Sequence, residues 1–259
     1  MAAELAAWDD PTVDWSRFDV LVVRSAWNCV TRPDEFLAWA ERAARVSHLH
    51  NPLEVLRWNM DKRYLADLAA DDIAVVETQW IEPSDQWTPP PGEFVIKPRI
   101  SGGGIDTARY GPHDHEHALA HRRRLQAGGR SVMVQPYVSS VDADGETALV
   151  FVGREYSHAV TKGALLRLGE GVVPELGERE VISPASPSES QILLAQAALE
   201  SARRGCGRPP LYSRVDVLGG AADAPVVLEL ELVDPVLFLR FSPGSAERLA
   251  SAIVQAIAS

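Results

Sequence analysis

The chain reads Phe94-Val95-Ile96-Lys97-Pro98-Arg99-Ile100-Ser101-Gly102-Gly103-Gly104, an apolar segment that delivers a lysine and is followed by a run of glycines. The apolar residues are typical of a β-strand. Glycines allow backbone N–H groups to approach an anion closely, and Lys97 adds a positive charge beside them. No Gly-Lys-Ser/Thr follows, so this is not a Walker A loop. A tight hairpin turn with a surface lysine would explain the same residues, and the stretch alone leaves both interpretations open.

A second pattern is a pair of acids in the apolar run from Val226 to Val233. On a strand, Glu229 and Glu231 point to the same face, because side chains alternate with a period of two. Two neighbouring carboxylates repel unless a cation lies between them, and hard oxygen ligands suit Mg²⁺ held jointly with phosphates. The alternative is the wet acidic face of an edge strand. We favour metal binding, because acids among so many apolar residues are costly when unpaired.

Two further strands carry polar groups of interest. Arg214 and Asp216 share one face of the strand expected at 211–217. Arginine can clamp a carboxylate or a phosphate, and Asp216 can join the acidic pair around a cation, although a cross-strand salt bridge is the ordinary alternative. The strand that begins at Val132 breaks at Pro136, which stops sheet pairing and frees the next backbone groups for a ligand.

The bulk composition limits the class of partner. The formal net charge is −11 over 259 residues, which argues against nucleic acid or an anionic membrane as a partner. Two isolated cysteines do not form a disulfide framework and fit a reducing compartment. No apolar run has the length of a membrane span, and the first ten residues lack a basic region. We therefore expect a cytoplasmic protein.

The order of expected elements divides the chain into three ranges. Alternating strands and helices in 1–77 predict a small α/β lobe, and the Pro-rich segment Trp80 to Gly92 reads as a linker. The second half reads as α+β, and the expected domains are 1–77, 78–137 and 138–259. The expected elements include a helix from Pro33, a helix at 60–70, a strand at 73–76, a helix at 115–126, a helix capped by Ser186 with Pro187 in its first turn, and a last helix capped by Ser242.

For the other residues of reactive type, we expect a surface or packing role and not a functional site. The histidines at 113, 115, 117 and 121 and the run Arg122-Arg123-Arg124 are typical of a solvated loop and helix surface. Cys29 has no adjacent base, so we expect core packing rather than nucleophilic catalysis. The tryptophans in the first 60 residues, Trp27 among them, are expected to pack the lobe.

The order of these pieces along the chain is specific where no single piece is. It runs from Lys62 in Asn59-Met60-Asp61-Lys62, through the Lys97 stretch and Gln135-Pro136-Tyr137-Val138, to Glu146, Lys162, Arg214-Val215-Asp216 and Glu229-Leu230-Glu231. This order resembles the ATP-grasp superfamily over almost the whole chain. Within it, the chain is most similar to the small glutathione-synthetase-like ligases that include the O-ureido-serine cyclo-ligase of cycloserine biosynthesis. The resemblance implies an ATP-grasp fold, with an N-terminally shortened α/β lobe ahead of two α+β subdomains that clamp ATP.

The resemblance also implies roles for individual residues. The ATP site would comprise Lys62 and Lys97 at the phosphates, Ser101, Gly102, Gly103 and Gly104 as a mobile lid, the hinge Gln135, Pro136, Tyr137 and Val138 at the adenine, and Glu146. The catalytic residues would be Lys162 and Arg214, which face the γ-phosphate and the substrate carboxylate. The ligands of Mg²⁺, with Mn²⁺ as the alternative ion, would be Asp216, Glu229 and Glu231.

The implied activity is that of an ATP-dependent C–N bond-forming ligase in antibiotic biosynthesis. It would act through an acyl phosphate on a small amino-acid-like carboxylate, and the resemblance allows intramolecular ring closure and a homo-oligomer. A peptide-tailoring ligase and a non-catalytic nucleotide-binding module are the alternatives. Two departures stand out. Many relatives carry Glu-x-Asn where this chain has Glu229-Leu230-Glu231, and relatives begin with a strand and helix ahead of the position that looks like Ala3 to Asp10. That unit is either lost or precedes a misassigned start.

Overall fold

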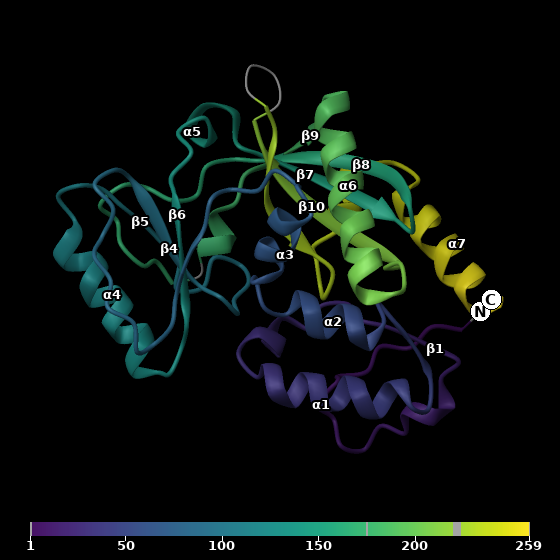
Figure 1. The fold of residues 1–259 in the computed structure, drawn as a ribbon. Helices are drawn as coiled ribbons and strands as arrows, with labels where there is room; N and C mark the ends of the chain where they lie inside the picture. Colours follow the sequence, from purple (N-terminus) through teal and green to yellow (C-terminus); the bar gives the residue numbers. More distant parts are fainter. Residues whose placement is uncertain (1, 175, 220–223, 259) are drawn as a thin grey trace.

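The computed structural model describes residues 2–174, 176–219 and 224–258, and its strands form three sheets. Figure 1 shows the four-stranded sheet and α4 at the left, the five-stranded sheet with α6 and α7 at the right, and the N-terminal helices α1 and α2 below. The three sheets lie within the ranges 1–77, 78–137 and 138–259 in turn. The domain boundaries themselves stay a prediction. Within the described residues, no helix has the length and hydropathy needed to cross a membrane.

The N-terminal lobe is a two-stranded parallel sheet covered by helices. Its elements are η1 (Trp15–Arg17), β1 (Val20–Val22), η2 (Trp27–Val30), α1 (Pro33–Ala44), β2 (His48–His50), α2 (Leu53–Asn59) and α3 (Tyr64–Ala70). As predicted, α1 begins at Pro33 and carries acids in its first turn, which favours the helix because a fixed φ and negative charge both suit an N-terminus. Phe36 and Leu56 are fully buried in the core of this lobe.

The middle sheet carries the lysine and glycine stretch. Its strands are β3 (Gln79–Ile81), β4 (Phe94–Pro98), β5 (Ala108–Tyr110) and β6 (Val132–Pro136), in the order β3-β6-β4-β5, all antiparallel. The helix α4 (His115–Ala127) packs on β4 and β5 and buries Ala118 and Leu125 against them. β6 ends at Pro136, as the sequence predicts.

The C-terminal sheet carries the acidic residues. Its strands have the order β11-β10-β7-β8-β9. They are β7 (Glu146–Val152), β8 (Glu155–Lys162), β9 (Ile182–Ala185), β10 (Tyr212–Leu218) and β11 (Val226–Glu231). The other elements of this part of the chain are α5 (Val141–Asp144), η3 (Leu176–Arg179), α6 (Glu189–Cys206), η4 (Leu239–Phe241) and α7 (Ser245–Ala258). The register pairs Arg214 with Glu231 and Asp216 with Glu229. All four side chains therefore lie on one face of two adjacent strands.

Several element boundaries differ from the sequence-based expectations. The helix expected at 60–70 begins only at Tyr64, because Lys62 N–H donates to Arg99 O at 3.0 Å instead of continuing a helix from α2. The strand expected at 73–76 is a single bridge from Val75 to Val227, and β3 overlaps the start of the expected linker. The capping box of α6 uses Ser188 and not Ser186, and α7 begins at Ser245.

Three side chains expected at the surface or in the lobe core lie elsewhere. His121 is buried and shares a hydrogen bond with the Tyr110 hydroxyl at 3.0 Å, because its face of α4 covers β5. Burial lowers the pKa of His121 to about 4. Arg122 is buried as well and donates to Asp85 O, whereas Trp27 is 72% exposed. Cys29 packs in the core of the N-terminal lobe, as predicted, and burial raises the pKa of its thiol to about 12.

Asn51 ties the N-terminal lobe to the C-terminal sheet. Its buried amide donates to Tyr212 O at 2.9 Å and to Leu232 O at 2.6 Å, and its Oδ1 accepts from Leu211 N–H at 2.6 Å. One side chain thus satisfies backbone groups of two segments far away in the sequence.

We expect Asn51→Ala to lower the free energy of unfolding by about 3 to 5 kcal/mol, since it leaves several buried backbone groups without partners. Urea denaturation followed by circular dichroism measures the change. The exposed Asn28 is the matched control, because Asn28→Ala removes a hydrogen bond from Trp8 and should cost only about 1 kcal/mol. Equal losses in the two variants would contradict the bridging role of Asn51.

Candidate active site

A cavity of about 800 Å³ lies between the four-stranded and the five-stranded sheet. Both faces of the cavity come from sheets, and the N-terminal lobe closes one side through η2 and the segment around Lys62. The volume falls within the range of ligand sites in proteins. Fifteen of the sixteen site residues expected from the sequence line this cavity: Lys62, Lys97, Ser101, Gly102, Gly103, Gly104, Gln135, Pro136, Tyr137, Val138, Glu146, Lys162, Arg214, Glu229 and Glu231. Asp216 lies just behind them, in contact with Lys162 and Arg214.

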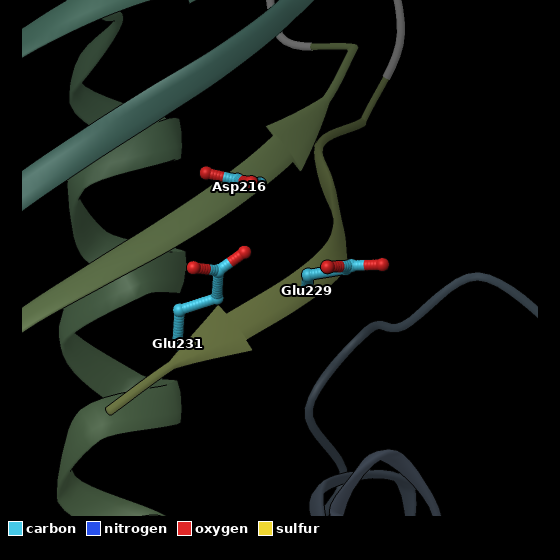
Figure 2. Close-up of side chains that lie close together, drawn as sticks. All are labelled: Asp216, Glu229 and Glu231. Carbon is cyan, nitrogen blue, oxygen red and sulfur yellow. The ribbon is translucent and has the colours of Figure 1, made fainter. Parts of the chain in front are cut away.

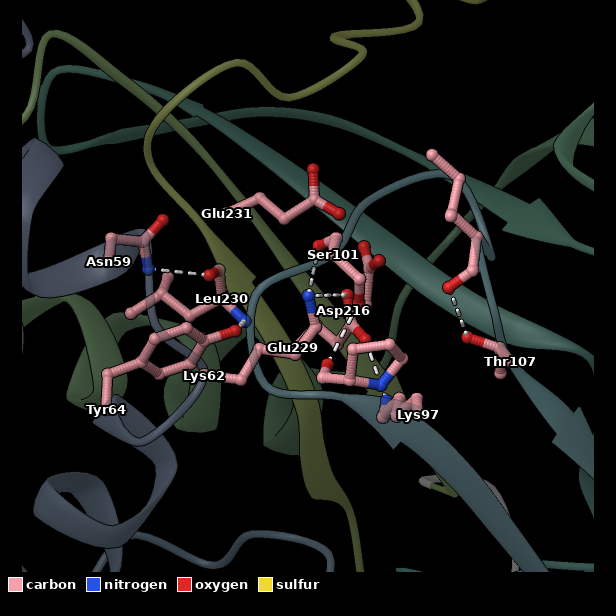
Figure 3. Close-up of polar contacts among 12 residues, drawn as sticks. Asn59, Lys62, Tyr64, Lys97, Ser101, Thr107, Asp216, Glu229, Leu230 and Glu231 are labelled. Atoms are coloured by element: carbon pink, nitrogen blue, oxygen red, sulfur yellow. Dashed lines mark hydrogen bonds and ion pairs between the residues drawn. The ribbon is translucent and has the colours of Figure 1, made fainter. Parts of the chain in front are cut away.

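Two buried lysines converge on Glu229. β4 carries Lys97, whose Nζ lies 2.8 Å from Glu229 Oε1, and the turn before α3 carries Lys62, whose Nζ lies 3.9 Å from Oε2 (Figure 3). Lys62 Nζ also donates to Ser101 O at 2.6 Å. Its turn is fixed by an ion pair between Asp61 and Arg99. Two positive charges at the base of a glycine loop can hold a phosphate chain.

The glycine loop lies against a second loop across the cavity. Gly103 and Gly104 have φ of +59° and +73°, which only glycine adopts without strain. A side chain at Gly104 would meet Leu176 at 3.0 Å, and one at Gly177 would meet Gly103 O at 3.1 Å. Backbones of residues 101–105 and of η3 therefore pack closely, and larger residues would force the two loops apart.

Two residues of the expected hinge already have hydrogen-bond partners within the protein. Gln135 is buried and donates to Thr78 Oγ1 at 2.9 Å, and Tyr137 N–H donates to Glu93 O at 2.8 Å. The Tyr137 ring lies under the Arg109 guanidinium, whose centre is 3.4 Å from the ring centroid. The N–H of Tyr137 is thus already bonded.

A second ionic cluster surrounds Lys162, which β8 delivers to the opposite side of the cavity. Its Nζ lies 2.8 Å from Asp216 Oδ2, 2.7 Å from Glu146 Oε2 and 3.9 Å from Glu180 Oε1. Burial alone would lower the pKa of Lys162, but the charges of Asp216 and Glu146 outweigh it and raise the pKa above its usual value. Lys162 therefore carries a stable positive charge.

Arg214 joins this cluster to the acidic pair. Its guanidinium donates from Nε to Asp216 Oδ1 at 2.8 Å and from Nη2 to Asp216 Oδ2 at 3.0 Å, the bidentate geometry of a strong ion pair. The same Nη2 donates to Glu231 Oε1 at 2.5 Å. Arg214 on β10 thus contacts one acid from its own strand and one from β11.

The three carboxylates fit a divalent cation. One oxygen each from Asp216, Glu229 and Glu231 lies within 4.8 Å of the others (Figure 2). Burial would raise the pKa of Glu229, but Lys62 and Lys97 lower it well below its usual value. Burial raises the pKa of Glu231, and the charges of Asp216 and Glu229 raise it further against the opposing Arg214. A cation among these oxygens would relieve that repulsion, and all-oxygen ligands suit Mg²⁺.

Sequence reasoning missed several residues that line or support the cavity. Asn59 donates to Leu230 O at 2.8 Å and accepts from Leu232 N–H at 2.7 Å, so it holds β11 in place. Glu180 and Asp234 line the cavity but lie in irregular segments after η3 and β11, where no periodic pattern marks them. Asn59 stands in the stretch that ends at Lys62, and that position was the available signal.

Comparison with known structures identifies the fold. The D-alanine–D-alanine ligase of Bacillus anthracis, solved in complex with ATP, aligns with 93% of this chain and 79% of its own, with a TM-score of 0.65 and 12% identity. That identity shows the fold alone. The chain thus has the ATP-grasp fold, which confirms the α+β ATP-grasp prediction.

The family is narrower than this class. The chain is 42% identical to the cycloserine biosynthesis protein DcsG of Streptomyces lavendulae over 98% of this chain and 89% of that protein. The crystal structure of D-cycloserine synthetase DcsG matches 99% of this chain and 90% of its own, at 40% identity and a TM-score of 0.90. Residues 1–51 match the family described as the N-terminal domain of D-cycloserine synthetase DcsG. The chain belongs to the DcsG family and is an ATP-dependent ligase.

Proposed function

We propose that this ligase joins a carboxylate to a nitrogen through an acyl phosphate, and that its substrate is a small amino acid which closes into a ring. The observation that carries the proposal is the convergence in one cavity of four buried cations with three carboxylates suited to a metal ion. Ring closure follows from the 42% identity to DcsG, which is described as a cycloserine biosynthesis protein and a D-cycloserine synthetase. The implied product is cycloserine or a close relative.

In the proposed first step, a carboxylate oxygen attacks the γ-phosphorus of ATP. The bond to the β–γ bridging oxygen breaks, and ADP leaves with that electron pair. Lys62 and Lys97 would hold the phosphate chain, and they can exchange Glu229 for phosphate oxygens without moving far, because both already lie at the base of the glycine loop. Positioning and neutralisation of charge are the main contributions of a protein to such a transfer.

In the proposed second step, a nitrogen of the same molecule attacks the acyl carbon and loses its proton, and the acyl C–O bond breaks as inorganic phosphate leaves with the electron pair. With O-ureido-serine, the bond from that nitrogen to the carbamoyl group must also break, and hydrolysis of the carbamoyl group releases carbon dioxide and ammonia. Arg214 would hold the substrate carboxylate and then the leaving phosphoryl oxygens, since its planar donors suit both groups. Asp216, Glu229 and Glu231 would hold Mg²⁺, or Mn²⁺ in its place, which would neutralise the phosphate charge when bound. The loops at 101–105 and η3 would exclude water from the acyl phosphate, because they already meet across the cavity.

An isotope experiment tests the acyl phosphate. O-Ureido-serine labelled with ¹⁸O in its carboxylate is incubated with the protein, ATP and Mg²⁺, and mass spectrometry follows the label. The proposal predicts release of ADP, appearance of cycloserine and transfer of one ¹⁸O into inorganic phosphate. Label in AMP would contradict the proposal, because it would mean attack on the α-phosphorus. No ADP release with any member of a panel of small amino acids would favour a peptide substrate or a nucleotide-binding module.

A further inference from the structure

One wall of the cavity is formed by η2 and residues 233–238. The side chains of Trp27, Cys29 and Val30 reach it from η2, and Asp234 and Val236 reach it from the segment after β11. We call these five residues the η2 wall. The assigned ATP and metal groups do not include any of them.

Asp234 is the one carboxylate of the η2 wall, and the backbone N–H groups of Ser25 and Ala26 lie against it. Its side chain is 7% exposed, and Oδ1 accepts from Ser25 N–H at 2.8 Å. Arg24 Nη1 lies 3.9 Å from Oδ1, but that nitrogen donates to Pro235 O at 2.7 Å. Oδ2 is buried and has no hydrogen-bond partner within the described ranges. A buried carboxylate oxygen without a donor is uncommon and marks a place for a ligand donor.

The cationic side chains that line the cavity come from residues outside the η2 wall. In the described part of the chain they are Lys62, Lys97, Lys162 and Arg214, and each contacts Glu229 or Asp216. None of the η2 wall residues is cationic. Trp27 adds an exposed indole, and an aromatic face attracts a cation. The wall therefore offers one carboxylate and one aromatic face, both of which suit a positively charged group.

The segment that carries Asp234 also contacts the arginine expected to hold the substrate. Arg214 Nη1 donates to Val236 O at 3.2 Å, two residues beyond Asp234. In an α-amino acid, the ammonium and the carboxylate are attached to the same carbon. A carboxylate held by Arg214 therefore places the ammonium group near this segment.

We propose that Asp234 binds the ammonium group of an α-amino acid substrate through Oδ2, with the indole of Trp27 as the adjacent aromatic face. This inference rests on the proposed function, because Arg214 must face the substrate carboxylate. It adds the residue that would select a substrate with a free amine over an acid that lacks one. Burial raises the pKa of Asp234 against the opposing Arg24, and a bound ammonium would stabilise the ionised carboxylate.

Binding measurements with a matched ligand pair test the inference. Isothermal titration calorimetry with the protein loaded with AMP-PNP and Mg²⁺ gives Kd for O-ureido-serine and for the same compound with hydrogen in place of the α-amino group. We expect the unchanged protein to prefer the amine by roughly ten- to a hundredfold, the value of a charge-assisted hydrogen bond. In Asp234→Asn, which keeps an oxygen for Ser25 N–H, the preference should fall close to one.

Two further variants control for shape and folding. Cys29→Ala changes the same wall without changing its charge, so the preference should persist. Trp27→Leu alters an exposed side chain and should reduce the preference roughly threefold, so it tests the inference even if Asp234→Asn does not fold. A preference that is unchanged in Asp234→Asn, or unchanged in Trp27→Leu when the first variant does not fold, would overturn the inference.

The outcomes separate this inference from the proposed function. Failure of the unchanged protein to bind either ligand, or equal affinity for both, overturns the role of Asp234. Turnover with an amine preference that Asp234→Asn leaves intact refutes the ammonium site and leaves the ligase proposal standing. Preferential binding that depends on Asp234 without any ADP release refutes the ligase proposal and supports the ammonium site.

Discussion

Lys97→Met is expected to lower kcat/KM for ATP about a thousandfold, the loss that follows removal of one preorganised charge from a dry site. Lys97 is buried at the end of β4, and its Nζ faces Glu229 at 2.8 Å. Methionine keeps the length of the side chain but has no charge. The phosphates would then lie beside the Glu229 carboxylate with only Lys62 left to neutralise it, and Lys62 Nζ lies 3.9 Å from Glu229 Oε2. Coupled detection of ADP release under saturating amino acid measures the change.

The Lys97→Met result is informative only if the variant folds and if loss of a positive charge elsewhere has a smaller effect. Glu229 keeps Lys62 as a partner, so the fold should survive, and circular dichroism with a melting curve checks this. Arg167→Met removes a positive charge from an exposed position and should leave the rate close to that of the unchanged protein. A similar small effect in Lys97→Met would remove Lys97 from the phosphate site, and a similar large effect in Arg167→Met would point to the overall field of the protein.

The site was most predictable where local geometry determines which side chains meet. Lys97 follows from an apolar strand before a glycine run, and the shared face of Glu229 and Glu231 follows from the period of a strand. Pairing of Arg214 and Asp216 with these acids required only that β10 and β11 be neighbours. Strand periodicity and neighbouring antiparallel strands thus predict the ionic core, and the resemblance adds its chemistry.

Other features depend on contacts that sequence periodicity does not encode. Asp234 lines the cavity because the backbone N–H of Ser25, more than two hundred residues earlier, donates to its carboxylate. Glu180 lines the cavity because it is attracted to the buried Lys162. The break between α2 and α3 follows from the backbone bond of Lys62 to Arg99. The burial of His121 depends on which face of α4 covers β5, and the mixed polar pattern of that helix conceals the choice.

Glu229→Gln is expected to lower kcat about a hundredfold or more and to raise the Mg²⁺ concentration for half-maximal activity at least about tenfold. If Glu229 is a direct ligand as proposed, its loss should exceed the loss from an outer-shell change. Glu229 holds two lysines while it faces the oxygens of Asp216 and Glu231. Its neutral replacement is a poorer metal ligand. A Mg²⁺ titration of ADP release measures both quantities.

Binding of ATP without metal separates metal coordination from a structural role for Glu229. Calorimetry in EDTA should give equal or tighter ATP binding in Glu229→Gln than in the unchanged protein. The reason is that the Glu229 carboxylate no longer competes with the ATP phosphates for Lys62 and Lys97. Glu231→Gln is the matched control. It also removes a proposed metal ligand, but Glu231 contacts Arg214 and neither lysine, so ATP binding without metal should stay unchanged. Weaker metal-free ATP binding in Glu229→Gln would mean that Glu229 positions the two lysines, and its loss of activity would then reflect a collapsed phosphate site instead of a missing metal ligand.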